Sequence, residues 1–444
     1  MNCGKLLLGI GLIIAMQPLT GYLGKRPSPA GSVSASSLSR PGAETSTAVA
    51  NTSSAIEVTD FCTAETGATD NTACVQRAID QAAAMGGGRV HFAPGTYLFT
   101  GTLNLNASNI TLDCGDMSAI LSFDNGAHDD IRIGFQPHVV VHPGIRGCWI
   151  THPGTKTGGV SLRYDNVFNG ITANVQIDNP YDGIEVENFN TMKWDSLYLV
   201  NLQDRSGNGF GMKFFKNAAL GQFGDVAIIT NSIIACQDTA GSYSMTGVAM
   251  DGIATLDMTH VGILQCSTGL WIANSAGNPV ENAVAFGNFN SVEIDGAHYI
   301  GLRIDAGHAL KFQGCDVWGG VRAMNIASNA SLLTFSGGRI GGAREQAAVI
   351  DGSHISFTGT VFTASSNAGF EAFPMIELAS KAAHISFNGV RSGPNPVNGA
   401  SNASYGLQID PGADYIIVQG SDLSGNVLGG IFGSAPHQAI GNNL

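Results

Sequence analysis

The sequence predicts an all-β fold: a single-stranded right-handed parallel β-helix with an N-terminal capping α-helix, spanning residues 55–444. The first observation is composition, because the 444 residues include 59 glycines while only 12% are charged and 8% aromatic. Such a mixture favours many short strands joined by tight turns over a helical bundle or a disordered chain. The second and third observations are a recurring short strand and the spacing of its copies.

The recurring strand is a glycine followed by two apolar residues that flank a variable one. Its copies are Gly183-Ile184-Glu185-Val186, Gly247-Val248-Ala249-Met250, Gly269-Leu270-Trp271-Ile272, Gly301-Leu302-Arg303-Ile304 and Gly406-Leu407-Gln408-Ile409. Gly247 and Gly269 lie 22 residues apart, whereas Gly269 and Gly301 lie 32 apart because a loop near 274–286 is inserted. A period near 22 with two or three short strands fits one coil of a parallel β-helix, whose strands stack about 4.8 Å apart.

A second strand follows each copy after a short turn. It reads Leu310-Lys311-Phe312-Gln313-Gly314, Leu333-Thr334-Phe335-Ser336-Gly337, Ile355-Ser356-Phe357-Thr358-Gly359, Ile385-Ser386-Phe387-Asn388-Gly389 and Ile416-Ile417-Val418-Gln419-Gly420. These matching patterns predict a second stack of strands with equivalent residues in register.

The ends of such a stack need covering, and the N-terminal region supplies a candidate. Residues 70–88 predict a helix, with Asp70 or Asn71 at its start, an apolar stripe, and three glycines at its end. Residues 1–24 have the lysine and short apolar run of a signal peptide or N-terminal anchor. Residues 25–54, rich in Ser, Ala, Pro and Thr, predict a flexible linker.

Charge and cysteine content restrict the partners. The formal net charge of −13 argues against nucleic acid, and mildly against strongly anionic polymers unless a local basic strip overrides it. No later segment predicts a membrane span, so a stable one is expected only if the signal stays uncleaved. Cys62 and Cys74 flank one short loop and can pair after export. Cys266 and Cys315 are expected to be buried small hydrophobes in preference to disulfide partners.

A family resemblance accompanies these patterns. Val58-Thr59-Asp60-Phe61, Thr69-Asp70-Asn71-Thr72, Pro94-Gly95-Thr96-Tyr97 and Asn109-Ile110-Thr111-Leu112 resemble the N-terminal signature of the pectate-lyase-like superfamily, which includes phage tailspike depolymerases and polygalacturonase-like proteins. With the repeats, the resemblance covers roughly residues 56 to 435. It implies a β-helix that acts on polysaccharide, as a monomer or homotrimer, and says little about the reaction, because one fold carries several chemistries.

Strand alternation predicts which side chains face outward. In the Gly-Φ-x-Φ copies both Φ residues point inward and x points outward. Along the stack the x positions are Ser161, Glu185, Lys213, Ala249, Trp271, Arg303, Asn325, Val349, Glu377 and Gln408. Charged groups suit sugar hydroxyls or uronates and an exposed aromatic suits a sugar face, so Lys213, Trp271 and Arg303 are candidate substrate-binding residues. The alternative is that outward positions of any solenoid are polar by default.

The turns that enter the strands hold candidate catalytic acids. Asp182 and Asp204 lie 22 residues apart, one coil, and Glu185 follows Asp182 on the same strand. The turn around Asp182 resembles that of polygalacturonase-type hydrolases, and two nearby acids can divide the roles of general acid and base. Here the second acid is single and is followed by Arg205, a candidate substrate-binding residue, and the family's Gly-His-Gly turn has no counterpart. Aspartates that cap turn amides are the simpler interpretation.

A further acidic pair, Glu293 and Asp295, flanks Ile294, so both should face outward from one strand. They are candidates for substrate binding, with a solvated strand face as the alternative. No motif predicts a metal site, and no cofactor is expected unless the protein is a lyase that uses calcium.

These observations favour an exported polysaccharide-degrading enzyme, with a glycoside hydrolase ahead of a polysaccharide lyase. The alternative is a non-catalytic glycan-binding or adhesin-like surface protein. A lyase would draw on Arg205, Lys213, Arg303, His260 or Tyr299 to neutralise a uronate and remove a proton.

Overall fold

The computed structural model describes residues 55–62, 69–204, 206–215, 224–237, 245–273, 284–394, 402–441 and 443. Residues 52–444 form one compact unit. The predicted signal segment (1–24) and linker (25–54) lie outside the described residues, so both stay predictions. Among the described residues, none of the helices has the length and apolar character that crossing a membrane requires.

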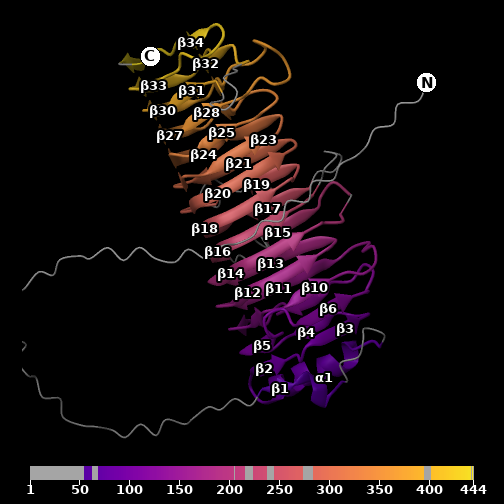
Figure 1. Cartoon of the computed structure of the whole chain (residues 1–444). Helices are drawn as coiled ribbons and strands as arrows, with labels where there is room; N and C mark the ends of the chain where they lie inside the picture. The colour runs from indigo at the N-terminus through magenta and orange to yellow at the C-terminus, as the bar shows by residue number, and fades with distance from the viewer. Residues whose placement is uncertain are drawn as a thin grey trace, which may run out of the picture. The chain divides into compact units, whose positions relative to one another are not determined.

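The unit is built from one long β-sheet that winds around itself in coils (Figure 1). Within the described residues the sheet has 35 strands, and all pairs between named strands are parallel. The all-β, parallel part of the predicted fold is therefore confirmed. Each strand pairs with its equivalents one coil before and one coil after, which sorts the strands into three stacks.

The first stack carries the recurring glycine strand. Its members are β4 (Leu103–Leu105), β7 (Ile131–Ile133), β8 (Val140–Val141), β11 (Val160–Phe168), β13 (Asp182–Asn190), β15 (Phe210–Phe215), β17 (Thr246–Asp251), β19 (Thr268–Ala273), β21 (Ile300–His308), β24 (Arg322–Ser336), β26 (Ala348–Ile350), β29 (Ile376–Leu378), β32 (Tyr405–Ile409) and β34 (Gly429–Gly433).

The second stack contains the second recurring strand. Its members are β1 (Ile56–Glu57), β2 (Gly88–His91), β5 (Ile110–Asp113), β9 (Gly144–Arg146), β12 (Ile171–Asp178), β14 (Met192–Val200), β16 (Gly224–Ala235), β18 (Ile253–Leu264), β20 (Asn288–Ala297), β22 (Lys311–Gln313), the end of β24, β27 (Ser353–Thr358), β30 (Ala383–Asn388), β33 (Asp414–Gln419) and β35 (Gln438–Gly441).

The third stack begins and ends with short strands of its own and, in between, uses the second halves of the long strands β12 to β20. Its separate members are β3 (Gly95–Phe99), β6 (Ala119–Phe123), β10 (Trp149–Thr151), β23 (Asp316–Gly319), β25 (Arg339–Gly341), β28 (Val361–Thr363) and β31 (Arg391–Gly393).

The predicted N-terminal helix is present as α1 (Thr72–Ala84), preceded by a 3-10 turn, η1 (Val58–Asp60). Asn71 is the N-cap residue, and Asp70 just before it stabilises the start of the helix, because Asp70 Oδ1 accepts hydrogen bonds from the backbone N of Thr72 at 3.0 Å and from the Thr72 hydroxyl at 2.6 Å. The helix buries Val75 and Ile79, as the apolar stripe predicts. Its role as a cap over the end of the stack stays a prediction.

The glycines of the repeat are explained by close approach between coils. A Cβ added at Gly183 would lie 2.1 Å from the carbonyl oxygen of Gly211, and one at Gly269 would lie 2.7 Å from that of Gly301. Real Cβ atoms do not approach so closely, so the first stack requires glycine here. The repeated glycine is therefore required by the packing between coils, in addition to the strand pattern that follows it.

The core is filled by aligned apolar side chains from all three stacks. Phe289, Phe312, Phe335, Phe357 and Phe387 form a continuous stack of rings, with neighbouring centroids 4.5, 4.6, 4.7 and 5.2 Å apart. Four of these phenylalanines belong to the second recurring strand, so the predicted register of that strand is confirmed.

The cysteines follow the prediction only in part. Cys62 is bonded to Cys74, as the loop spacing indicates. The interpretation of Cys266 as an unpaired hydrophobe is wrong, because it forms a disulfide with Cys236, and a third bond joins Cys114 to Cys148. Stacking brings positions 30 and 34 residues apart into adjacent coils, a proximity that a motif search along the chain does not detect.

Candidate functional site

A straight column of outward side chains runs along the first stack. Strand pairing places its members opposite one another in the order Asn104, Arg132, Arg163, Glu185, Lys213, Ala249, Trp271, Arg303, Asn325, Val349, Glu377 and Gln408. The predicted register of the column is therefore correct from Glu185 onward, but Val349, which was expected to face outward, is buried. Neighbouring members stand about 4.8 Å apart, the spacing of paired strands.

Ser161 is the one wrong member of the predicted column. The register pairs Arg163 with Glu185, and Ser161 is fully buried. Gly159 lies 24 residues before Gly183, two more than the usual period, and the register pairs Val160 with Asp182, so Ser161 lies opposite Gly183 and not opposite Glu185. The 22-residue period from Glu185 leads directly to Arg163.

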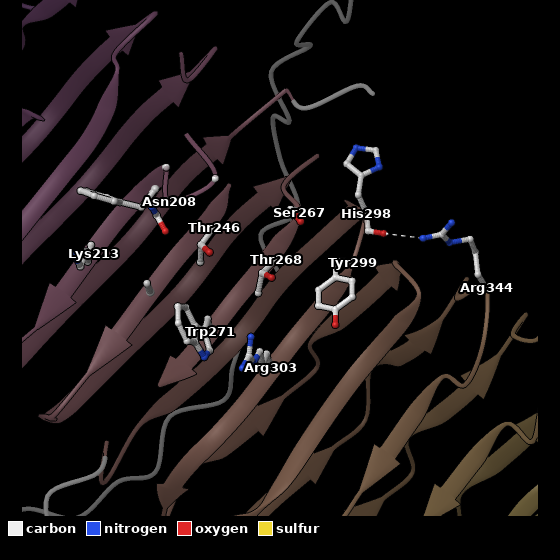
Figure 2. A pocket seen from close by; sticks show the side chains of 14 residues that line it. Asn208, Lys213, Thr246, Ser267, Thr268, Trp271, His298, Tyr299, Arg303 and Arg344 are labelled. Carbon is white, nitrogen blue, oxygen red and sulfur yellow. Dashed lines mark hydrogen bonds between the residues drawn. The ribbon is translucent and has the colours of Figure 1, made fainter. Parts of the chain in front are cut away.

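The column opens into a pocket of about 710 Å³ on the outer face of β15 to β21 (Figure 2). The described residues that line it are Gly207, Asn208, Gly209, Phe210, Lys213, Thr246, Ala249, Ser267, Thr268, Trp271, His298, Tyr299, Arg303 and Arg344. We call it the main pocket. Among these residues are three aromatic side chains, three permanent cations and no carboxylate, which makes the described wall positively charged although the chain is acidic overall.

Trp271 and Arg303 form a fixed unit in this wall. The guanidinium carbon of Arg303 lies 4.9 Å from the centre of the Trp271 ring. Asp305, from the same strand as Arg303, accepts hydrogen bonds from Arg303 Nε at 2.9 Å and from Trp271 Nε1 at 2.9 Å. A second Arg303 nitrogen lies 2.8 Å from Asp305. Asp305 thus orients both side chains, and Figure 2 shows them side by side.

Lys213 occupies the N-terminal end of the main pocket. Its ammonium lies 5.3 Å from the centre of the Phe210 ring and 4.9 Å from that of Phe215. It is also 4.0 Å from a carboxylate oxygen of Glu185. The lysine therefore joins the aromatic wall of the pocket to the acidic residues one coil earlier.

Asp182 stands one coil before Phe210, at the equivalent position, and so borders the main pocket. It is half-buried, and its Oδ1 accepts a hydrogen bond of 3.2 Å from the backbone N of Phe210. The pKa of Asp182 is raised to about 7, chiefly by burial; the nearby charges of Asp204 and Glu185 add to the rise, while the Phe210 N–H and Lys213 oppose it. This carboxyl keeps its proton close to neutral pH.

Glu185 stands one coil before Lys213 and is only 7% exposed. Burial raises its pKa, while Arg163 and Lys213 act in the opposite direction. One oxygen of Glu185 forms an ion pair with Arg163, and the other faces Lys213. Two acids with different surroundings, one protonated and one ion-paired, thus lie at one end of the pocket.

Asp204 has a different role in the structure. Its carboxylate accepts hydrogen bonds from the backbone N of Ser206 at 2.6 Å and from the Ser206 hydroxyl at 3.0 Å. It is 3% exposed and packs against Gly209. These contacts are those of a residue that caps a turn, and its charge acts on Asp182 from there.

Comparison with known proteins adds three findings. Residues 55–121 match the sequence model of the family described as rhamnogalacturonase A/epimerase, pectate lyase-like. None of the curated proteins matches this sequence. The fold matches tailspike protein 3 of bacteriophage CBA120 (TM-score 0.61, 14% identity, 88% of this chain and 61% of that one). It also matches the Dettilon tailspike (TM-score 0.57, 14% identity, 85% and 68%).

The resemblance to the pectate-lyase-like superfamily is confirmed. The identities are low, so these matches establish the fold alone, and the present chain spans about 61% of the length of tailspike protein 3. A family 28 exopolygalacturonase of Yersinia enterocolitica also matches (TM-score 0.47, 16% identity, 87% and 77%).

The remaining candidate residues that the structure describes do not lie in the main pocket. Arg205 lies outside the described residues. Glu293 and Asp295 are both exposed, as their alternation predicts, but they belong to the third stack and pair with β18 and β23. They do not line the main pocket.

A metal site has no support in the described part of the chain, where no three His, Cys, Asp or Glu side chains lie close enough to hold an ion. The main pocket presents Lys213, Arg303 and Arg344, and a cluster of cations does not suit calcium, which requires several oxygen ligands.

The sequence analysis missed four residues of this region: Arg163, Phe210, Asp305 and Arg344. The 22-residue period could have identified Arg163, and the alternation after Arg303 could have identified Asp305 as a second outward position. Phe210 and Arg344 lie near turns of irregular length, so only the coil geometry brings them to the pocket.

Proposed function

We propose that the protein is an exported polysaccharide-degrading enzyme, a glycoside hydrolase in preference to a lyase, that binds an anionic glycan along the outer face of the first stack. The main pocket carries the proposal, because its wall has three aromatics and three cations and it borders Asp182, whose pKa is raised to about 7.

The pocket wall explains the choice of an anionic glycan. Trp271 and Tyr299, the latter 52% exposed, offer ring faces to the C–H surface of a sugar. Lys213, Arg303 and Arg344 can bind carboxylate or sulfate groups, and Arg303 keeps its planar donors aligned through Asp305. Together these groups hold the sugar ring and its charge at the same time.

The acids at the end of the pocket supply the chemistry of hydrolysis. Asp182 donates its proton to the glycosidic oxygen as the bond from that oxygen to the sugar carbon breaks. Glu185 accepts a proton from the water molecule that adds to the same carbon. This division of roles predicts activity that falls as the pH rises above about 7, because Asp182 then loses the proton it must donate.

A non-catalytic glycan-binding protein is the second candidate, and one observation favours it. Asp182 accepts a bond from the Phe210 amide and Asp204 from the Ser206 amide, so both aspartates also serve the turns. A protein that kept the pocket and these caps would bind glycan without cleaving it.

The test is an incubation of the full chain with a panel of neutral and uronate-containing polysaccharides, including rhamnogalacturonan and polygalacturonate, with and without EDTA. New reducing ends and the ultraviolet absorbance of unsaturated uronates would be recorded. Reducing ends without absorbance support the hydrolase; both signals together replace it with a lyase; binding without either supports the second candidate.

Three variants assign the reaction to this site. Asp182→Asn and Glu185→Gln should each lower the rate by about a hundredfold or more, the usual contribution of a general acid or base. Asp195→Asn changes a partly exposed aspartate of the second stack, bonded to Thr230, and should keep the parent rate. Full activity in both Asp182→Asn and Glu185→Gln would remove this site from consideration.

A further inference from the structure

A second pocket, of about 350 Å³, lies on the same stack nearer the N-terminus. We call it the distal pocket. Its wall includes Arg132 and Arg163 of the outward column. It also includes Asp165, two residues after Arg163, and Glu187, two residues after Glu185. Phe135, 42% exposed, stands at the same pocket and packs against His138 with ring centres 4.9 Å apart. An exposed ring beside guanidinium groups repeats the chemistry of the main pocket.

The carboxylate of Asp129 anchors both arginines. The same oxygen of Asp129 accepts hydrogen bonds from Arg132 Nε at 2.7 Å and Arg163 Nε at 2.8 Å. Its other oxygen accepts one from the backbone N of Val160 at 2.9 Å. Burial alone would raise the pKa of Asp129, but these bonds outweigh it and lower the pKa, so the carboxylate stays charged. Each arginine therefore uses its Nε for the anchor, and Arg163 also pairs with Glu185 through a terminal nitrogen.

The outward column of the first stack connects the two pockets. Only Glu185 stands between Arg163, at the edge of the distal pocket, and Lys213, at the edge of the main pocket. Its carboxylate is paired with both neighbours, so no unpartnered charge interrupts the surface. Two strand spacings, about 10 Å, separate Arg163 from Lys213, a distance that a short oligosaccharide covers.

We propose that the distal pocket is a second sugar subsite, which binds an uncharged unit of the same glycan chain that the main pocket holds by its anionic groups. This inference rests on the proposed function and adds a specificity to it: the substrate carries neutral sugars among acidic ones.

The charges of the two pockets lead to this distinction. The described wall of the main pocket has three cations and no carboxylate. The wall of the distal pocket balances Arg132 and Arg163 against the carboxylates of Asp165 and Glu187. A uronate there would meet two carboxylates, whereas sugar hydroxyls can donate to these carboxylates and accept from the arginines.

Binding measurements on the full chain with the Asp182→Asn change, which prevents cleavage, test the proposal. The probes are oligogalacturonates, in which every unit is acidic, and rhamnogalacturonan oligosaccharides, in which acidic and neutral units alternate. Each is used in a length that fills the main pocket alone and in a length that spans both pockets.

The long alternating oligosaccharide should bind tightest. Arg132→Ala and Phe135→Ala should each weaken its binding by roughly tenfold, the loss expected for a charge-assisted contact or a stacked ring, and leave the short oligosaccharides unaffected. Arg146→Ala, an exposed arginine of the second stack, is the control and should bind as the parent does. Arg132→Lys should recover part of the loss.

Different outcomes contradict the distal subsite and the proposed function. If Arg132→Ala and Phe135→Ala bind the long oligosaccharides as Arg146→Ala does, the distal subsite is wrong. If no probe binds, or if Arg303→Ala binds short and long oligosaccharides as well as the parent does, the proposed function fails instead. A preference for the long all-acidic probe over the alternating one would overturn the neutral character of the distal pocket.

Discussion

The raised pKa of Asp182 makes a prediction about stability that needs no substrate. The pKa rises from 3.8 to about 7 in the folded protein, mainly through burial. Below pH 4 the carboxyl is protonated in both the folded and unfolded chains, so it does not affect folding. As the pH rises from about 4 to 7 the unfolded chain ionises first, and the folded protein loses stability until its own carboxyl ionises.

The magnitude follows from the size of the change. A shift of about three pKa units, at 1.36 kcal/mol each, corresponds to about 4 kcal/mol as an upper bound, because residual contact with water reduces the penalty. Asp182→Asn removes the ionisation and keeps an oxygen that can accept the Phe210 amide. The variant should match the parent near pH 4 and exceed its free energy of unfolding by up to that amount at pH 8.

Urea unfolding of the parent and Asp182→Asn at several pH values between 4 and 8 measures this difference. The contributions of other groups, including Glu185, are present in both proteins and largely cancel. A difference between the two unfolding free energies that stays constant over the whole pH range would refute the reasoning, since it would mean that Asp182 ionises as it does in water.

Three further predictions concern the scaffold. Replacing both Cys236 and Cys266 by Ser should lower the free energy of unfolding by about 2–4 kcal/mol, and an unchanged urea midpoint would show that the bond does not form. Lys156→Met should cost about 3–5 kcal/mol, because Lys156 Nζ bonds to the fully buried carboxylate of Asp130; a neutral effect in thermal unfolding would contradict this. Gly269→Ala should destabilise by about 1–3 kcal/mol through the clash with the next coil, and a variant as stable as the parent would disprove the packing constraint.

The fold was predictable because its signal repeats. Every coil presents the same short strand, so a single register error, as at Ser161, leaves the rest of the column correct. The core ring stack followed in the same way from equivalent phenylalanines such as Phe312 and Phe335. In a solenoid each coil contacts only its neighbouring coils, so a pattern that repeats along the sequence also shows which residues pack together.

The candidate site was predictable only where it follows the period. Lys213, Trp271 and Arg303 were found because they occupy the repeated outward position. Arg344 and the orienting Asp305 were not found, because one comes from an irregular turn and the other acts through hydrogen bonds that only coordinates reveal. Glu293 and Asp295 show the converse: alternation gave their exposure correctly but not which of the three stacks carries them.

One binding comparison tests directly whether the main pocket binds an anionic glycan. Polygalacturonate and a neutral polysaccharide would be titrated into the parent, Arg303→Ala and Arg339→Ala. Arg339 is a matched control, because it is an exposed arginine paired with Asp316 on the third stack, as Arg303 is paired with Asp305 on the first. We expect that the parent prefers the anionic polymer, that Arg303→Ala weakens the binding of this polymer by roughly tenfold, and that Arg339→Ala does not. Equal binding by all three proteins, or a preference for the neutral polymer, would contradict this expectation.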